Sequence, residues 1–293
     1  MNLLSSAHQS GFLEGKQPAE PVPKDREWIS MNVHHQDCVL VERHDRIGHI
    51  RLNRPKSLNT LDEALGSALL AAITDLSSDA DIRVIVLSGA GRSFMAGGDL
   101  SAFSADLENA STTAGRLIDL FHGTMRRIAA CDQIVIAAVQ GPVAGGGVSL
   151  ALGADLCIAA ADAHFVSAYA QIATNPDGGG SWSVTQVLGP KRALGFLLLP
   201  ERINAEAALT LGMVNEVVPP EQLMDRTFAL ADRLSLGARK AQAGIKRLVR
   251  TAITGTMDAQ FDLEKAGFMA HAAGADFREG ITAFLARRPA RFE

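Results

Sequence analysis

Two short apolar runs, each followed by a glycine-rich loop and the start of a helix, most constrain how this chain can fold. The runs are Val84–Leu87 and Ile134–Val139, and consecutive apolar residues of this kind are typical of strands buried on both faces. Glycine clusters follow at Gly97–Gly98 and at Gly145–Gly147. Two successive units of strand, loop and helix predict an α/β core.

Two helix starts of this kind could bind a developing negative charge. The first N–H groups of a helix have no partner within it and lie at the positive end of the helix dipole. Glycine at that point lets a ligand approach the backbone without meeting a Cβ. Two such helix starts directed at one point would form an oxyanion hole for a carbonyl oxygen. The spacing is equally compatible with two tight turns that only need glycine.

The region before these units predicts a hairpin and a helix. Val39–Arg43 and Ile47–Leu52 flank Asp45 and are typical of two short strands that form a hairpin. Thr60 and Glu63 have the spacing of a capping box, and an Ala/Leu-rich helix is expected from there to about Leu76.

The region after them predicts further strands and then a helical end. Asp155–Ala160 and Val214–Val218 are candidate strands, and the sequence after Pro219 is helical in pattern almost to its end. The basic stretch Arg239–Arg250 is interpreted as a solvated helix face. The expected organisation is a flexible N-terminal extension over residues 1–31, a core over 32–225 and a C-terminal helical region over 226–293.

Composition and motifs narrow the function classes. A net charge of −4 argues against a general nucleic-acid-binding surface, and three widely spaced cysteines suit a reducing compartment rather than a disulfide or zinc framework. No apolar run is long enough to span a membrane and the N-terminus lacks a secretory pattern, so we expect a cytoplasmic protein without a membrane partner. The glycine loops match neither a phosphate-binding loop nor a dinucleotide fingerprint, and the histidines lack metal-ligand spacing.

Five segments together resemble the crotonase superfamily, the enoyl-CoA hydratase/isomerase family. The likeness covers nearly everything from Val39 to Phe292. It implies a ClpP/crotonase-like spiral of repeated ββα units with a C-terminal helical trimerisation region, and a homotrimer or hexamer. It also implies an acyl-CoA thioester substrate and no cofactor beyond its CoA moiety. The matching segments are Ile50–Leu61, Val84–Leu100, Ile134–Leu150, Asn175–Gly180 and Arg278–Gly280.

The resemblance also assigns expected site residues. By motif position, the amides of Gly98 and Gly146 would bind the thioester carbonyl, which favours the oxyanion-hole interpretation over tight turns. The expected substrate-binding residues are Lys56, Ser57 and Leu58 at the CoA nucleotide, and Ala96, Asp99, Leu100, Val143 and Gly145 around the thioester.

Departures from the family pattern are informative. Hydratases of the family use two glutamates, where this chain has Ser149 and Tyr169. Neither side chain can act as a carboxylate base. Asp177 stands where several isomerases carry their single catalytic carboxylate and where a dehalogenating relative carries its nucleophile. Its alternative role is a helix N-cap. Tyr169 could line the acyl pocket with a free hydroxyl, or simply pack there.

The leading hypothesis is an enoyl-CoA isomerase in which Asp177 moves a proton through an enolate held by Gly98 and Gly146. The alternatives within enzymes are hydration, or hydrolysis of a thioester or carbon–halogen bond. An alternative of another class is a non-catalytic member that binds acyl-CoA, or RNA through the basic stretch Arg239–Arg250.

Overall fold

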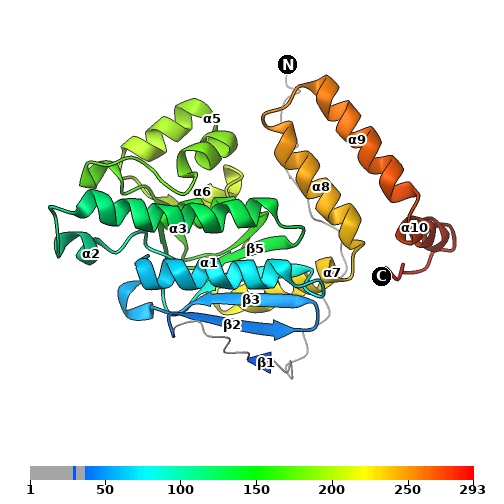
Figure 1. The fold of residues 1–293 in the computed structure, drawn as a ribbon, viewed down its shortest axis with the longest axis horizontal. Coiled ribbons are helices and arrows are strands. Elements are labelled where there is room, and N and C mark those ends of the chain that lie inside the picture. The colour runs from blue at the N-terminus through cyan, green and yellow to red at the C-terminus, as the bar shows by residue number, and fades with distance from the viewer. Residues whose placement is uncertain (1–28, 31–36) are drawn as a thin grey trace, which may run out of the picture.

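The computed structural model describes Ile29–Ser30 and residues 37–293. Apart from Ile29 and Ser30, the extension expected over residues 1–31 lies outside the described residues. The described chain forms a sheet flanked by helices, with a helical arm at its C-terminal end (Figure 1). The strands of this part are β1 (Ile29–Ser30), β2 (Val39–His44), β3 (Ile47–Leu52), β4 (Val84–Gly89), β5 (Ile134–Val139), β6 (Pro142–Ala144), β7 (Leu156–Ala160), β8 (His164–Val166), β9 (Ile203–Asn204) and β10 (Glu216–Val218).

The helices connect these strands and close the chain. The α-helices are α1 (Glu63–Ser78), α2 (Leu100–Ser104), α3 (Ala110–Ala130), α4 (Gly146–Gly153), α5 (Gly180–Leu198), α6 (Ala205–Thr210), α7 (Leu223–Ser235), α8 (Arg239–Ala252), α9 (Met257–Ala272) and α10 (Ala275–Leu285). Short 3-10 helices are η1 (Pro55–Ser57), η2 (Ala170–Ile172) and η3 (Pro220–Gln222). Among the described helices, none combines the length and the apolar character needed to cross a membrane.

The main sheet of the described chain has the strand order β1-β2-β3-β4-β5-β7-β10, and β6, β8 and β9 form a second, small sheet. The predicted hairpin is confirmed, because β2 and β3 pair antiparallel around Asp45. The pairs from β3 to β10 are parallel, so the ends of β4 and β5 lie side by side. The two glycine-rich loops therefore leave the same edge of the sheet.

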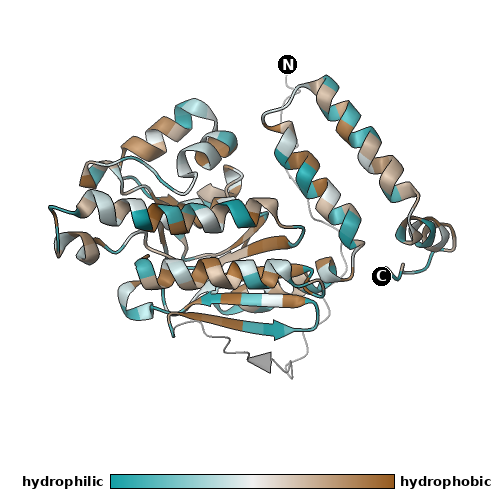
Figure 2. Ribbon diagram, in the orientation of Figure 1, coloured by the Kyte–Doolittle hydropathy of each residue, from teal (hydrophilic) through white to brown (hydrophobic). Residues whose placement is uncertain are grey.

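The central strands are buried on both faces. Ile85 and Leu87 face a core shared with α1 and α3, whereas Val84 and Val86 face a second core built with α7. Figure 2 shows the neighbouring strand β5 coloured mostly as hydrophobic. Burial on both faces explains why β4 has no polar alternation, as its sequence predicts.

Helix α1 begins later than the capping-box pattern predicts. Its N-cap is Asp62, whose carboxylate accepts a hydrogen bond from Leu65 N–H at 2.8 Å, and Glu63 is its first residue. Leu61, between Thr60 and Asp62, forms a bridge with the loop after β4 and is held extended. The expected cap at Thr60 is therefore wrong, because that tertiary contact delays the start of the helix.

A buried chain of hydrogen bonds joins three neighbouring strands. His49 Nε2 lies 2.7 Å from Ser88 Oγ, and His49 Nδ1 lies 3.1 Å from Glu42 Oε2. The bond from His49 is the main reason why the pKa of Glu42 is lowered. Although the order of groups resembles a nucleophilic triad, Ser88 is only 3% exposed and His49 only 4%. We interpret this chain as a structural link between β2, β3 and β4.

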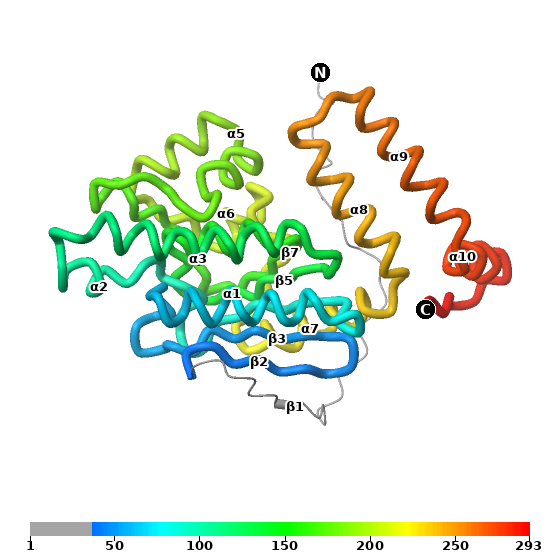
Figure 3. Tube along the Cα trace, in the orientation of Figure 1, coloured from blue at the N-terminus to red at the C-terminus, as the bar shows by residue number. Residues whose placement is uncertain are grey.

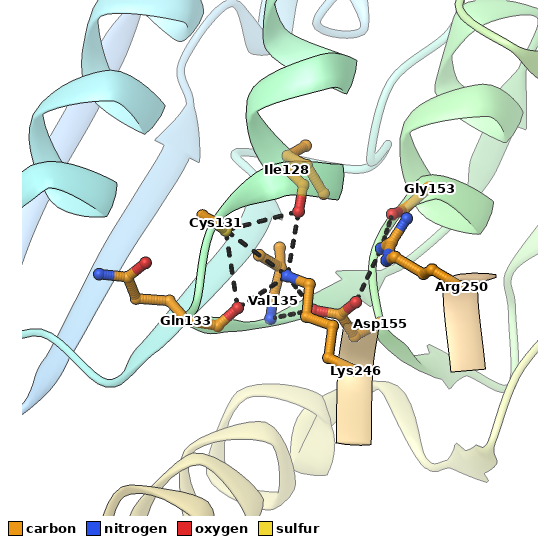
Figure 4. Close-up of polar contacts among 8 residues, drawn as sticks. All are labelled: Ile128, Cys131, Gln133, Val135, Gly153, Asp155, Lys246 and Arg250. Carbon is orange, nitrogen blue, oxygen red and sulfur yellow. Dashed lines mark hydrogen bonds and ion pairs between the residues drawn. The ribbon is translucent and has the colours of Figure 1, made fainter. Parts of the chain in front are cut away.

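Helices α8, α9 and α10 form an arm beside the sheet and its flanking helices (Figures 1 and 3). A buried polar cluster attaches this arm to the core (Figure 4). Lys246 Nζ on α8 lies 2.8 Å from Asp155 Oδ2 and donates to Ile128 O at 3.0 Å and Gln133 O at 2.8 Å. Arg250 donates to Asp155 Oδ1 at 2.7 Å.

The interpretation of 239–250 as a solvated face is thus wrong for Lys246, which is 6% exposed. A helix that docks on a buried carboxylate places its charges inward, and no local pattern reveals this. The ammonium group is stable there because a carboxylate and two carbonyl oxygens replace its water.

Candidate functional site

The loops that follow β4 and β5 are in contact. Met95 and Val143 form an isolated parallel bridge between them. Just beyond it, a Cβ built on Gly145 would lie 3.5 Å from the Cα of Gly97. Gly97 has a φ of 86° and Gly145 a φ of 50°, values that residues with a side chain rarely adopt. Glycine is therefore required here both for the backbone turns and for the approach of the two loops.

Gly98 and Gly146 each follow one of these contacting glycines. Gly146 is the first residue of α4, where an N–H has no partner in its own helix. Leu61 is hydrogen-bonded to the residues on either side of Gly98. Its N–H donates to Gly97 O, and its carbonyl accepts from Asp99 N–H, both at 2.8 Å. Within residues 37–293, neither the Gly98 nor the Gly146 amide donates a hydrogen bond. Two such amides on contacting loops can bind one carbonyl oxygen.

Asp177 belongs to a hydrogen-bonded group with Ser149 and Tyr169. Tyr169 Oη donates to Asp177 Oδ1 at 2.7 Å, and Ser149 Oγ donates to the Asp177 backbone carbonyl at 2.9 Å. Burial and then the negative charge of Asp177 raise the pKa of Tyr169 above its ordinary value, so the phenol stays neutral. One alternative from the sequence was that the Tyr169 hydroxyl is free to orient a substrate. In the structure this hydroxyl is hydrogen-bonded to Asp177.

The side chain of Asp177 does not cap a helix. Helix α5 starts at Gly180 with Gly179 as its N-cap, and no side chain caps it. Only the backbone carbonyl of Asp177 contacts the helix start, where it accepts from Gly180 N–H at 2.8 Å. The N-cap alternative for Asp177 is therefore wrong, and its carboxylate is left for other contacts.

Two aromatic side chains connect the carboxylate segment to the loop of Gly146. The ring of Tyr169 packs on Gly145, where an added Cβ would lie 3.7 Å from Cζ. The ring of Phe121, on α3, lies between Gly146 and Gly178: an added Cβ on Gly146 would be 3.4 Å from Phe121 Cε1, and one on Gly178 would overlap the ring. The segment that carries the carboxylate and the α4 amide are therefore neighbours across these rings.

His122 holds the backbone at the residue after Asp177. Gly178 N–H donates to His122 Nε2 at 3.2 Å, so this ring nitrogen acts as the acceptor. Neither His122 nor Phe121 belongs to a motif that can be recognised in the sequence. A lone histidine or phenylalanine on an amphipathic helix has no spacing that distinguishes it from a packing residue, so only the fold could identify them.

The expected CoA-binding residues lie beside the Gly98 loop. Lys56 is exposed at η1, and the Leu58 carbonyl accepts from Ala96 N–H at 3.1 Å. The fully buried Asn59 holds this segment in place, because its amide nitrogen donates to Ser93 O at 2.8 Å. Asn59 was also not singled out from the sequence, although its left-handed φ of 56° is a conformation in which asparagine is enriched.

The expected thioester-lining residues differ in accessibility. Leu100 is exposed, whereas Val143 is fully buried in the core. Asp99 is the N-cap of α2, and its carboxylate accepts from Ser101 Oγ at 2.6 Å and from Arg54 at 3.1 Å. The bond from Ser101, followed by that from Arg54, lowers the pKa of Asp99. Arg54 is thereby held in ion pairs within the loop.

Two cavities near the Asp177 segment differ greatly in volume. Behind Tyr169 the enclosed space is only about 10 Å³, bordered by Val148, Ser149 and Phe196. A cleft of about 330 Å³ borders Gly178, and its walls include His122, Met125, Leu152, Trp182 and Arg250. This cleft therefore lies next to the segment that carries Asp177, between α3 and α5.

Comparison with known proteins identifies the fold and the family. The family described as "Enoyl-CoA hydratase/isomerase" matches residues 42–293. The 1,2-epoxyphenylacetyl-CoA isomerase of Escherichia coli K12 is 38% identical over 83% of this chain and 93% of its own. The crotonyl-CoA hydratase of Syntrophomonas wolfei is 32% identical over 87% of this chain and 97% of its own.

A solved structure, an enoyl-CoA hydratase from Polaromonas sp. JS666, superimposes with a TM-score of 0.84 and 32% identity over 87% of this chain and 99% of that one. The expected α/β crotonase-type fold with a C-terminal helical region is thus confirmed. This protein is a member of the enoyl-CoA hydratase/isomerase family of enzymes.

Proposed function

We propose that this protein is an enoyl-CoA isomerase, which moves the double bond of an enoyl-CoA thioester between the β,γ and α,β positions. One observation carries the proposal. The carboxylate beside the Gly146 loop is that of Asp177. At the two positions where the family resemblance would place the glutamates of a hydratase, this chain has the hydroxyl groups of Ser149 and Tyr169, and both donate hydrogen bonds to Asp177.

In the proposed reaction, the amides of Gly98 and Gly146 donate to the thioester oxygen. Their dipoles stabilise the negative charge that forms there, which makes the α C–H of the substrate acidic. Asp177 takes the α-proton, and the electron pair of that C–H bond enters a dienolate. The dienolate then takes the proton from Asp177 at its γ-carbon, which leaves an α,β double bond and restores the carboxylate.

The substrate would lie across both loops. The nucleotide of CoA would lie near the exposed Lys56, whose ammonium can pair with a phosphate. The acyl group would point toward the cleft of about 330 Å³ between α3 and α5, because the space behind Tyr169 is filled. No cofactor beyond CoA takes part in this scheme.

Hydration is the second candidate, because a relative at 32% identity is a crotonyl-CoA hydratase. A panel of 2-enoyl- and 3-enoyl-CoA esters, aliphatic and aromatic, distinguishes the two reactions by chromatography of the products. Interconversion of the two enoyl isomers supports the proposal. Conversion to 3-hydroxyacyl-CoA, or to free CoA, without interconversion would overturn it in favour of hydration or thioester hydrolysis.

We also propose that the protein assembles as a homotrimer or hexamer through its arm. The arm exposes large apolar side chains, among them Val249, Phe261, Phe268 and Phe284, which an isolated chain would leave in water. Light scattering of the pure protein tests this. A mass of three or six chains supports assembly, whereas the mass of one chain at micromolar concentration contradicts it.

A further inference from the structure

Tyr169 and Asp177 stand at the two ends of one exposed loop. The loop turns through η2, where the amides of Ile172 and Thr174 both donate to the carbonyl of Tyr169, and residues 170–175 are exposed. A carboxylate at the end of such a loop needs a contact that fixes its orientation. The hydrogen bond from Tyr169 Oη to Asp177 Oδ1, at 2.7 Å, closes the loop and supplies that contact.

The backbone of Asp177 is held separately from its side chain. Ser149 Oγ holds its carbonyl at 2.9 Å, and the next amide, Gly178 N–H, is held by His122 Nε2 at 3.2 Å. In the described part of the chain, Tyr169 is the sole hydrogen-bond partner of the carboxylate oxygens. Rotation of the carboxylate is therefore controlled by one hydroxyl group.

We infer that Tyr169 is a positioning residue that holds Oδ1 of Asp177 and leaves Oδ2 as the one oxygen that exchanges a proton with substrate. The inference rests on the proposed isomerase function. A shuttle that removes a proton at one carbon and returns it two carbons away must keep one oxygen directed at the substrate throughout. A carboxylate free to rotate would present either oxygen, and the reacting geometry would be less frequently populated.

The hydroxyl is well suited to this role. Burial and the charge of Asp177 keep it protonated, so it remains a donor to the carboxylate. Its ring packs on Gly145, beside the amide of Gly146, so the same side chain fixes the carboxylate relative to the glycine loop. Phenylalanine would keep the ring packing and remove only the donor.

Kinetics of Tyr169→Phe provide the first test. We expect kcat to fall about 10²-fold while KM stays within about 3-fold, because orientation and not binding is lost. Gln171→Ala, an exposed change in the same loop, serves as the control. In the Asp177→Asn background, Tyr169→Phe should have no further effect. Unchanged kcat in Tyr169→Phe, or an equal loss in both backgrounds, would overturn the inference.

A second test needs no turnover. Tyr169 is the sole tyrosine of the sequence, so protein labelled with ¹³Cζ-tyrosine gives one NMR resonance. We expect this resonance to shift between the wild type and Asp177→Asn, and Gln171→Ala to leave it in place. An identical resonance in wild type and Asp177→Asn would show that the hydroxyl does not contact the carboxylate. If the resonance shifts but no enoyl-CoA is isomerised, the contact stands and the proposed function fails.

Discussion

Gly97 and Gly145 lie back to back, so that a Cβ on Gly145 would be 3.5 Å from the Cα of Gly97. This contact joins the two glycine-rich loops, and each loop has a backbone amide that can bind a ligand, that of Gly98 on one and that of Gly146 on the other. The repeated pattern of strand, loop and helix start indicates both loops, but only the parallel pairing of β4 with β5 brings them together.

Alanine substitutions distinguish glycines that the packing of the core requires from glycines that leave the backbone open to a ligand. A Cβ on Gly147 would overlap the backbone carbonyl of Met95, whereas one on Gly98 would meet only Phe103, at 3.8 Å. We expect Gly147→Ala to lower the free energy of unfolding by about 3 kcal/mol. Gly98→Ala should change it by about 0.5 kcal/mol or less. Urea unfolding checks both, and equal losses would contradict the packing described here.

The attachment of the arm depends on a buried ammonium group. Lys246→Met leaves Asp155 with Arg250 as its remaining cation, and the carbonyls of Ile128 and Gln133 lose this donor. We expect a loss of about 3 kcal/mol in the free energy of unfolding. Lys240→Met on the exposed face of α8 is the matched control and should change little. The comparison is made at equal protein concentration, and similar stability of the two variants would contradict a buried role.

Acid should weaken the loop of Gly98. Because the pKa of Asp99 is lowered in the folded protein, first by the bond from Ser101 and then by Arg54, its contribution to stability is present above about pH 4. It is lost as the pH falls below that value through the lower, folded-state pKa. Thermal unfolding should thus show a smaller loss of stability on acidification for Asp99→Asn than for wild type. The exposed Asp81→Asn should behave as wild type, and parallel curves for Asp99→Asn and wild type would contradict this assignment.

Much of the framework could be predicted from local pattern. The hairpin around Asp45 and the strands predicted at Val84–Leu87 and Ile134–Val139 follow from short apolar runs, and the first strand extends to Gly89 in the structure. The start of α1 could not, because the extended bridge at Leu61 overrides the capping pattern. The burial of Lys246 could not be predicted either, because its partner Asp155 is distant in sequence.

The candidate site was predicted unevenly for the same reason. The glycine loops and Asp177 belong to recognisable motifs. The hydrogen bond from Tyr169 to the Asp177 carboxylate becomes apparent only in the folded structure. Tyr169 and Ser149 were noted because they depart from the family pattern, and nothing in the sequence indicates that both hydroxyls bond to Asp177. His122 reaches Gly178 from another helix and leaves no local signal.

The central claim is that Asp177 moves the proton, and Asp177→Asn tests it most directly. Asparagine keeps the size of the side chain and an oxygen that can accept from Tyr169, but it cannot act as a base. With the enoyl-CoA ester that the wild type isomerises fastest, we expect kcat to fall about 10³-fold. The Kd of a saturated acyl-CoA should stay within about 3-fold, because the contacts to CoA and the oxyanion amides are unchanged. Isomerisation at a rate within a few-fold of wild type would contradict the account.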